Sequence, residues 1–144
     1  MFELISISEA IKRSYESEGV LVDVRSEEDF RKGHLPMAVN IPFDEIMQME
    51  GKADLEKFNL GKFEPGKYDV EKVDSKKINI EKEYDVEKGG AVFLYCDTGS
   101  TSMLAAKKLS SMGIHAYSVV GGVLFYKGYL EKEKNDLWTM VRTP

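Results

Sequence analysis

The chain has 144 residues, a length that suits one domain. Acidic residues (25) outnumber basic ones (20), and the net charge of −5 argues against a general nucleic-acid binder, which needs a basic face to neutralise phosphates. No apolar run approaches the roughly 18 residues of a membrane span. Glu3 precedes any apolar stretch, so the first residues do not resemble a signal peptide. We therefore expect a single domain over residues 1–144 that is soluble and cytoplasmic and binds neither nucleic acid nor a membrane.

Short apolar runs alternate with segments of helical pattern along the chain. The runs predict strands at residues 2–7, 20–24, 38–41, 91–95 and 114–120. Capping residues and helical spacing predict helices at residues 9–15, 26–32, 102–112 and 123–134, and one or two helical turns within residues 44–58. Ser8 and Ser26 are the expected N-caps of the first two helices. Strands that alternate with helices predict an α/β domain with a mainly parallel sheet.

Residues 59–90 interrupt this rhythm. They are dense in Lys, Glu and Asp, and the sequence Tyr-Asp-Val-Glu-Lys occurs at residues 68–72 and again at 84–88. Both copies alternate apolar with polar residues, which suits the strands of a half-exposed ribbon. We interpret the segment as a charged surface insertion within the domain, with a hairpin that docks a partner as the alternative. Its nearly balanced charge argues against a nucleic-acid or membrane surface.

The strongest chemical signal is the segment from Cys96 to Ser102, between a buried strand and a helix. A single cysteine excludes an internal disulfide and a Cys-rich zinc site. Open α/β sheets place their ligands at such a strand end, where loop N–H groups and the helix N-terminus can lower a thiol's pKa from about 8.5. Gly99 permits close backbone approach, and the hydroxyls of the following residues add donors and help to cap the helix. A lone cysteine is more often a small buried apolar residue, but this context favours a reactive thiol.

Further motifs accompany this loop in the sequence. Asp23-Val24-Arg25 lies at an expected strand end and is followed by Glu28, Phe30 and the turn at residues 33–42, and a glycine pair lies at residues 121–122. In their order and spacing, together with the loop at residues 96–102, these motifs resemble those of the rhodanese-like family. The resemblance covers nearly the whole chain apart from the insertion. It implies a flattened α/β sandwich, with a five-stranded, mainly parallel sheet flanked by helices on both faces.

The resemblance also implies sulfurtransferase chemistry. Cys96 would take a sulfane sulfur from a small donor or a persulfidated protein, hold it as a persulfide, and pass it to cyanide or a protein thiol. N–H groups of the loop would stabilise the thiolate or the outer sulfur, as an oxyanion hole stabilises its charge. Asp23 and Arg25 would support the loop, in a structural role more than a chemical one. Neither a cofactor nor a metal is implied. The substrate-binding loop comprises Asp97, Thr98, Gly99, Ser100, Thr101 and Ser102.

Two features depart from the family pattern, and one residue differs from the phosphatases of the related fold. Many thiosulfate-using relatives carry Arg or Lys inside the loop, where this chain has Asp97 and Thr98. A carboxylate that faces the site opposes ionisation of the thiol and repels thiosulfate, which favours a less charged or protein-borne donor. Met37 stands where the family usually has Gly, so we expect the turn to take another backbone conformation. Ser102 stands where Cys-dependent phosphatases of the related fold need Arg, which argues against phosphatase activity.

Several residues outside the loop carry weaker signals. We expect His34 to donate a hydrogen bond that fixes the turn at residues 33–36 rather than to act in catalysis. His115 has no evident partner and is expected at the surface or as a satisfied core residue. Phe125 and Tyr126 are expected to pack the last helix, although either could border the mouth of the active site.

Two other functions stay open at this stage. A non-enzymatic rhodanese-like binding or regulatory module would fit Asp97 and the long insertion. A redox-sensing thiol is a further alternative, but its resolving thiol would have to come from elsewhere because the chain has a single cysteine. Stable gain of one sulfur atom on Cys96 would separate the enzyme or carrier from the binding module.

Overall fold

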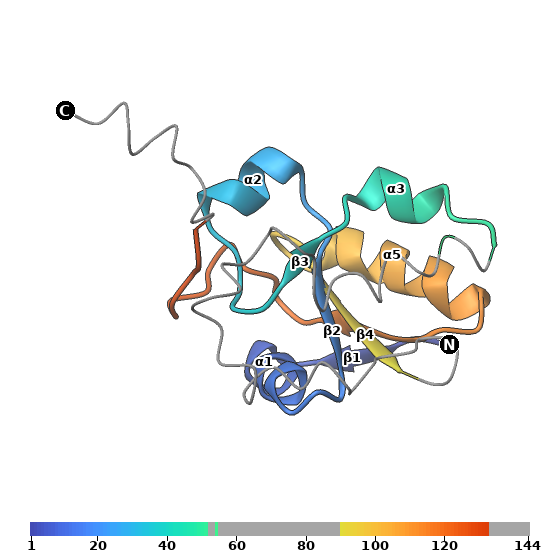
Figure 1. The fold of residues 1–144 in the computed structure, drawn as a ribbon, viewed down its shortest axis with the longest axis horizontal. Helices are drawn as coiled ribbons and strands as arrows, with labels where there is room; N and C mark the ends of the chain where they lie inside the picture. The colour runs from blue at the N-terminus through green and yellow to red at the C-terminus, as the bar shows by residue number, and fades with distance from the viewer. Residues whose placement is uncertain (52–53, 55–89, 133–144) are drawn as a thin grey trace, which may run out of the picture.

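Five parallel strands form one sheet in the order β1-β5-β4-β2-β3 (Figure 1). The computed structural model describes residues 1–51, 54 and 90–132. The sheet confirms the predicted fold class, and β4 lies at its centre, between β5 and β2. The strands are β1 (Glu3–Ile5), β2 (Gly19–Asp23), β3 (Val39–Asn40), β4 (Ala91–Tyr95) and β5 (His115–Val119).

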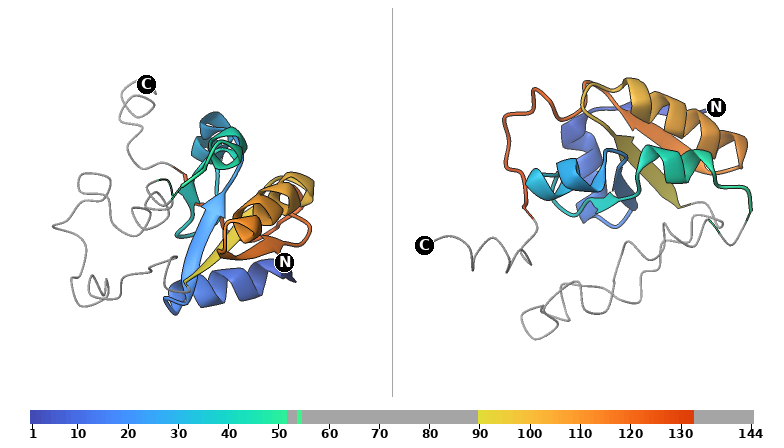
Figure 2. Two further views of the ribbon diagram at one scale, coloured as in Figure 1. Left: turned by 90° about the vertical axis from the view of Figure 1, so that its right-hand side faces the viewer. Right: turned by 90° about the horizontal axis from the view of Figure 1, so that it is seen from above.

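Helices cover both faces of this sheet, as expected (Figures 1 and 2). Helix α1 (Ile7–Tyr15) lies on one face, and α3 (Phe43–Met47) and α5 (Ser100–Ser111) lie on the other. Helix α2 (Glu27–Lys32) follows β2 and buries Phe30 in the core on the α1 side. Both faces of the sheet are therefore covered by helices, so a site for a ligand is expected at the ends of the strands.

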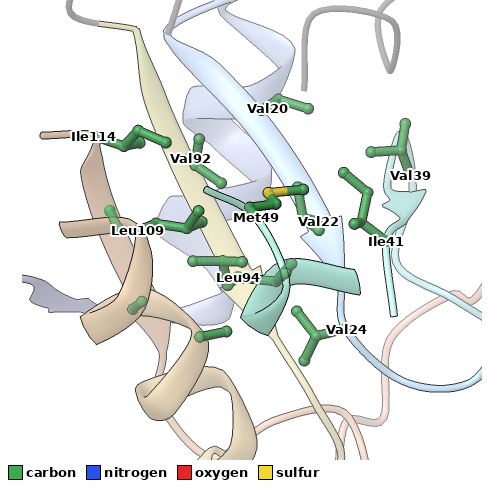
Figure 3. Packing of buried hydrophobic residues seen from close by; sticks show 14 of the residues in the cluster. Val20, Val22, Val24, Val39, Ile41, Met49, Val92, Leu94, Leu109 and Ile114 are labelled. Carbon is green, nitrogen blue, oxygen red and sulfur yellow. The ribbon is translucent and has the colours of Figure 1, made fainter. Parts of the chain in front are cut away.

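The buried side chains alternate between two cores, one on each face of the sheet. Val22 and Leu94 belong to the core beneath α3 and α5, where they share a cluster with Leu109 (Figure 3). Leu21 and Phe93, each one residue earlier, belong to the core beneath α1. Because both faces are buried, β2 and β4 read in the sequence as nearly continuous apolar runs.

Helix α1 begins earlier than the sequence analysis predicted, and β1 is correspondingly shorter. Ser6 has an extended backbone and its side chain accepts the N–H of Glu9 at 3.1 Å, so Ser6 is the N-cap. The prediction of Ser8 is wrong because Ser6 has the three-residue spacing to Glu9 that capping requires. Ser26 is confirmed as the N-cap of α2, since it accepts the N–H of Asp29 at 3.2 Å.

The turn between α2 and β3 contains Met37 in the left-handed region, with φ of 67°. The expectation that a methionine would force another conformation here is wrong, because the turn keeps the φ that glycine favours. Neighbouring contacts fix it: the N–H of Leu35 donates to the Tyr95 hydroxyl at 3.0 Å, and the N–H of Ala38 donates to the carbonyl of Leu35 at 3.1 Å. The turn therefore imposes its geometry on the methionine.

Residues 121–131 form a segment, here called the strap, that crosses from the end of β5 to the loop after β4. The helix predicted at residues 123–134 is wrong over its described part, residues 123–132, which contains no helix. The N–H groups of Val123 and Leu124 donate instead to the carbonyls of Cys96 and Asp97, both at 2.9 Å. These tertiary hydrogen bonds hold the strap against the loop that contains the cysteine.

His34 anchors the far end of the strap. Its backbone exchanges two hydrogen bonds with Glu131, at 2.9 and 2.8 Å. Its Nδ1–H donates to the carbonyl of Phe30 at 2.8 Å, and its ring stacks on the Phe30 ring, so the imidazole fixes the end of α2 rather than the turn that follows. His115 is exposed, as one of the two expectations had it, and its Nε2 lies 2.9 Å from the Glu3 carboxylate.

Some predictions fall outside the described residues. The charged insertion at residues 59–90 lies there except for Gly90, as does the repeated sequence within it. The turns predicted within residues 44–58 correspond, in the described part, to α3. The single-domain assignment for residues 1–144 stays a prediction.

Candidate active site

Cys96 directly follows β4, at the edge of the sheet where the parallel strands end. It is only 4% exposed, and three groups from the following loop reach its sulfur. The N–H of Gly99 donates to Sγ at 3.0 Å, the N–H of Ser102 donates at 3.4 Å, and the Ser102 Oγ lies 3.5 Å away. The loop therefore curls around the sulfur and presents hydrogen-bond donors to it.

The sulfur also accepts a hydrogen bond from the amino end of α5. The N-cap of this helix is Gly99, which adopts φ of 101° and has no side chain to accept a helical N–H. The prediction that loop hydroxyls cap the helix is wrong, because none of the described hydroxyls of the loop accepts an N–H of the first helical turn. The N–H of Ser102, which a capping side chain would normally satisfy, points instead at Cys96. The positive end of the helix dipole is therefore directed at the thiol.

The surroundings of Cys96 favour the thiolate. Burial raises the pKa of the thiol, but hydrogen bonds from the Ser102 hydroxyl and from the N–H groups of Ser102, Gly99 and Thr98 outweigh burial. The pKa of Cys96 is consequently lower than that of an ordinary cysteine. A thiolate is a stronger nucleophile than a thiol, and it is also the form that these donors bind best.

The remaining loop side chains point elsewhere. Asp97, Thr98 and Ser100 are exposed, and Thr101 is half-buried in the first turn of α5. The hydroxyls of Thr98 and Ser100 lie 3.4 Å apart. Of the six predicted loop residues, the structure thus brings Thr98, Gly99 and Ser102 to the sulfur, the first two through their backbone alone.

Asp23 and Arg25, the two supporting residues predicted beside the loop, form a bidentate ion pair at the end of β2. The Arg25 Nη2 lies 2.7 Å from one Asp23 oxygen, and Nε lies 3.0 Å from the other. Asp23 is fully buried, and the Asn40 amide donates to the backbone carbonyls of both residues. Burial alone would lower the pKa of Arg25, but the hydrogen bonds and charge of Asp23 raise it, so the guanidinium stays protonated.

The other side of the Arg25 guanidinium faces the loop at residues 96–102. Its Nη1 lies 3.6 Å from Oδ1 of Asp97, whose side chain is 53% exposed. The orientation of Asp97 was left open by the sequence. In the structure its carboxylate is directed at the Arg25 guanidinium, which partly balances its negative charge. Arg25 in turn is engaged by two carboxylates, which leaves it poorly placed to bind an anionic donor.

The strap lies beside the loop where a helix was expected, and Phe125, which was one of two residues that could border the mouth of the site, lies on it. A Cβ on Gly122 would overlap the carbonyl of Asp97 and lie 2.5 Å from the Cys96 carbonyl oxygen, so the two backbones are packed without room for a side chain. The signal was present in the glycine pair at residues 121–122, because paired glycines mark close backbone approach. Next along the strap, Leu124 is 57% exposed and Phe125 is 79% exposed, so two apolar side chains stand free beside the loop.

The fold and the site together identify the class of protein. The chain belongs to the rhodanese-like domain family, whose family model matches residues 6–128. Solved structures with the same fold include a rhodanese-like domain protein from Staphylococcus aureus, with a TM-score of 0.54 and 23% identity over 91% of this chain and 98% of that one. A human single-domain sulfurtransferase has a TM-score of 0.52 and 21% identity, over 83% of this chain and 92% of that one.

One curated relative is much longer than this chain. The tRNA sulfurtransferase of Desulfurococcus amylolyticus is 26% identical over 121 residues, which make up 84% of this chain. The chain spans only 17% of that relative's length. Within the part of the chain that the structure describes, none of the helices has the length and apolar character needed to span a membrane.

Proposed function

We propose that this protein is a sulfurtransferase or persulfide carrier that moves a sulfane sulfur through a persulfide on Cys96. The observation that supports this most is the sulfur at the end of β4, held by donors from Gly99 and Ser102 and with its pKa lowered. A cysteine that only fills apolar space in the core would not need such donors. A covalent intermediate on this thiolate divides one difficult transfer into two easier ones.

In the loading step, the Cys96 thiolate attacks the outer sulfur of a donor persulfide, R–S–SH. A bond forms between Sγ and that sulfur, the S–S bond of the donor breaks, and its electron pair leaves with R–S⁻. The leaving thiolate takes up the proton that the outer sulfur carried. The N–H groups of Gly99 and Ser102 lie where they can stabilise the charge on the sulfur before attack. In the unloading step, cyanide or a thiolate attacks the outer sulfur, the Sγ–S bond breaks, and the Cys96 thiolate is restored.

The surface around the loop favours a weakly charged or protein-borne sulfur donor over thiosulfate. Arg25, a cation beside the loop, is 10% exposed at its side chain and already paired with Asp23 and Asp97. The neighbouring strap presents Leu124 and Phe125 to solvent, where a protein partner can bury them. Such a partner, or a small persulfide, would deliver sulfur without the repulsion that a dianion meets beside Asp97.

Mass spectrometry after exposure to polysulfide, and separately to thiosulfate, tests this proposal. The wild type is expected to gain one sulfur atom from polysulfide and to lose it when cyanide or a thiol is added, while loading from thiosulfate is slow. Cys96→Ser and Cys96→Ala should gain none. Both should stay folded, with a lower unfolding temperature for Cys96→Ala because the N–H groups of Gly99 and Ser102 lose their acceptor. A folded wild type that takes sulfur from neither donor would overturn the proposal and favour the binding module. Retained transfer in either variant would remove Cys96 from the mechanism.

A further inference from the structure

Two serine hydroxyls meet in the protein interior beside the Cys96 sulfur. Ser102, from the first turn of α5, and Ser118, from β5, are both fully buried, and their Oγ atoms lie 2.9 Å apart. Ser102 Oγ is also 3.5 Å from Sγ and 3.1 Å from the carbonyl oxygen of Gly99. The mechanism proposed above uses Ser102 and leaves Ser118 without a role.

A serine at position 118 is unusual for this strand. Its neighbours along β5, Ala116, Tyr117 and Val119, are buried and contribute to the two apolar cores. A buried hydroxyl costs free energy unless it is hydrogen-bonded, and alanine would fit the same space without that requirement. The hydrogen bond that the structure gives to the Ser118 hydroxyl is the one to Ser102.

The possible proton positions in this cluster follow from counting donors and acceptors. Ser102 has one hydroxyl proton and two lone pairs, whereas the Gly99 carbonyl can only accept. With Cys96 as a thiol, S–H donates to Ser102 Oγ, Ser102 donates to Gly99, and Ser118 donates to the second lone pair of Ser102. All the groups are then satisfied.

Ionisation of Cys96 changes one of these hydrogen bonds. The S–H bond breaks, the proton passes to solvent, and the electron pair stays on sulfur. The Ser102 hydroxyl can then turn from the Gly99 carbonyl to the thiolate, while Ser118 continues to donate to Ser102. A hydroxyl that accepts a hydrogen bond donates a stronger one, because chains of hydrogen bonds polarise one another.

We propose that Ser118 is a positioning residue for the Cys96 nucleophile, whose hydroxyl donates to Ser102 and thereby directs the Ser102 hydroxyl at the sulfur. The proposal rests on the proposed function for its biological meaning, but its physical content concerns the free thiol. It makes β5, as well as the loop and α5, part of the apparatus that prepares the cysteine for attack.

The first test removes the Ser118 hydroxyl in two differently shaped pairs of variants. Ser118→Ala is compared with wild type, and Ser118→Val is compared with Ser118→Thr, which has nearly the same shape but keeps the hydroxyl. The pKa of Cys96 is read from the pH dependence of its alkylation by iodoacetamide. We expect it to rise by roughly half a unit in the Ala and Val variants, since polarisation changes a charge-assisted hydrogen bond by a fraction of its strength. The alkylation rate below the pKa should then fall about threefold.

The second test asks whether Ser118 acts through Ser102. In a Ser102→Ala background, Ser118→Ala should leave the pKa of Cys96 unchanged, because the group that carries the effect is gone. Ser14→Ala is the matched control, since it removes a buried serine hydroxyl on α1, on the opposite face of the sheet. It should leave the pKa of Cys96 at the wild-type value whatever it does to stability.

The outcomes are distinct from those that test sulfur transfer. An unchanged pKa in both hydroxyl-deleted variants, or an equal rise in the Ser102→Ala background, would overturn the proposal even if the wild type transfers sulfur. A lowered pKa would also overturn it, because it would mean that Ser102 donates to Ser118 and is drawn away from sulfur. If the pKa behaves as expected but no sulfur is ever loaded, the positioning role stands and the proposed function fails.

Discussion

Adding one methyl group to the strap should distinguish its two adjacent glycines. Gly121 and Gly122 both adopt positive φ, 81° and 65°, so alanine is strained at either position. A Cβ on Gly121 would meet no atom within 4 Å, whereas one on Gly122 would overlap the Asp97 carbonyl. Gly121→Ala therefore measures the backbone strain alone, and Gly122→Ala measures the strain together with the loss of contact between strap and loop.

The difference in the free energy of unfolding can be worked from these contacts. Left-handed backbone costs an alanine about 1–2 kcal/mol in either variant. In Gly122→Ala the strap must also move away from the loop, which weakens the hydrogen bonds from Val123 and Leu124 to the loop carbonyls. Two such bonds at about 1 kcal/mol each, with some cost of overpacking, make this variant about 2–3 kcal/mol less stable than Gly121→Ala.

Thermal unfolding and thiol alkylation measured on the same samples would check this prediction. For a domain of this size we expect the Tm of Gly122→Ala to lie about 8–12 °C below that of Gly121→Ala. Alkylation of Cys96 should change only in Gly122→Ala, because only there does the backbone that carries the sulfur shift. Equal melting temperatures would show that the strap does not hold the loop, and the reasoning from its hydrogen bonds would fail.

Two further predictions concern the charges beside the loop. Asp97→Asn should raise kcat/KM for thiosulfate by up to about fivefold at low ionic strength, since removing an exposed charge 3.6 Å from Arg25 is worth about 1 kcal/mol or less. The gain should vanish in high salt. The control is Glu18→Gln, at the opposite end of the sheet, which should not raise kcat/KM; an identical gain in this variant would mean that net charge alone is responsible. Arg25→Gln should lower the free energy of unfolding in denaturant by about 3–5 kcal/mol, because it leaves the buried Asp23 carboxylate without its partner. Arg31→Gln breaks an exposed ion pair and should cost about 0.5 kcal/mol or less, so similar losses in the two variants would contradict this assignment.

The parts of the fold that could be predicted were those where local sequence and burial agree. The central strands β2 and β4 are apolar at nearly every position because both faces are covered, and α5 is bounded by glycines. The strap could not be predicted from composition. Its residues are compatible with a helix, but hydrogen bonds to the carbonyls of Cys96 and Asp97 replace the helical ones, so tertiary contacts override propensity.

In the candidate site, too, the contacts between residues close in sequence could be predicted, whereas a contact between distant residues could not. Cys96, Gly99 and Ser102 lie within one short loop, so their meeting follows from local geometry. The contact between Arg25 and Asp97 joins ends of adjacent strands that are distant in sequence, and its geometry depends on how β2 and β4 pair. Residue types gave no means to tell whether the aspartate faced the sulfur or the guanidinium. The fold decides this by placing a charged partner within reach.

The anchoring of the strap also bears on the order in which the protein becomes competent during synthesis. A chain made from its amino terminus releases the cysteine loop before the residues that fasten it. Until residues 121–124 follow, the carbonyls of Cys96 and Asp97 lack the strap N–H groups that hold them in the folded protein. We expect the nascent loop to sample many shapes during this interval, with the thiol outside its ring of donors. The lowered pKa of the thiol would then arise only once the chain has grown past the strap, so the sulfur of an unfinished polypeptide ionises like that of an ordinary cysteine.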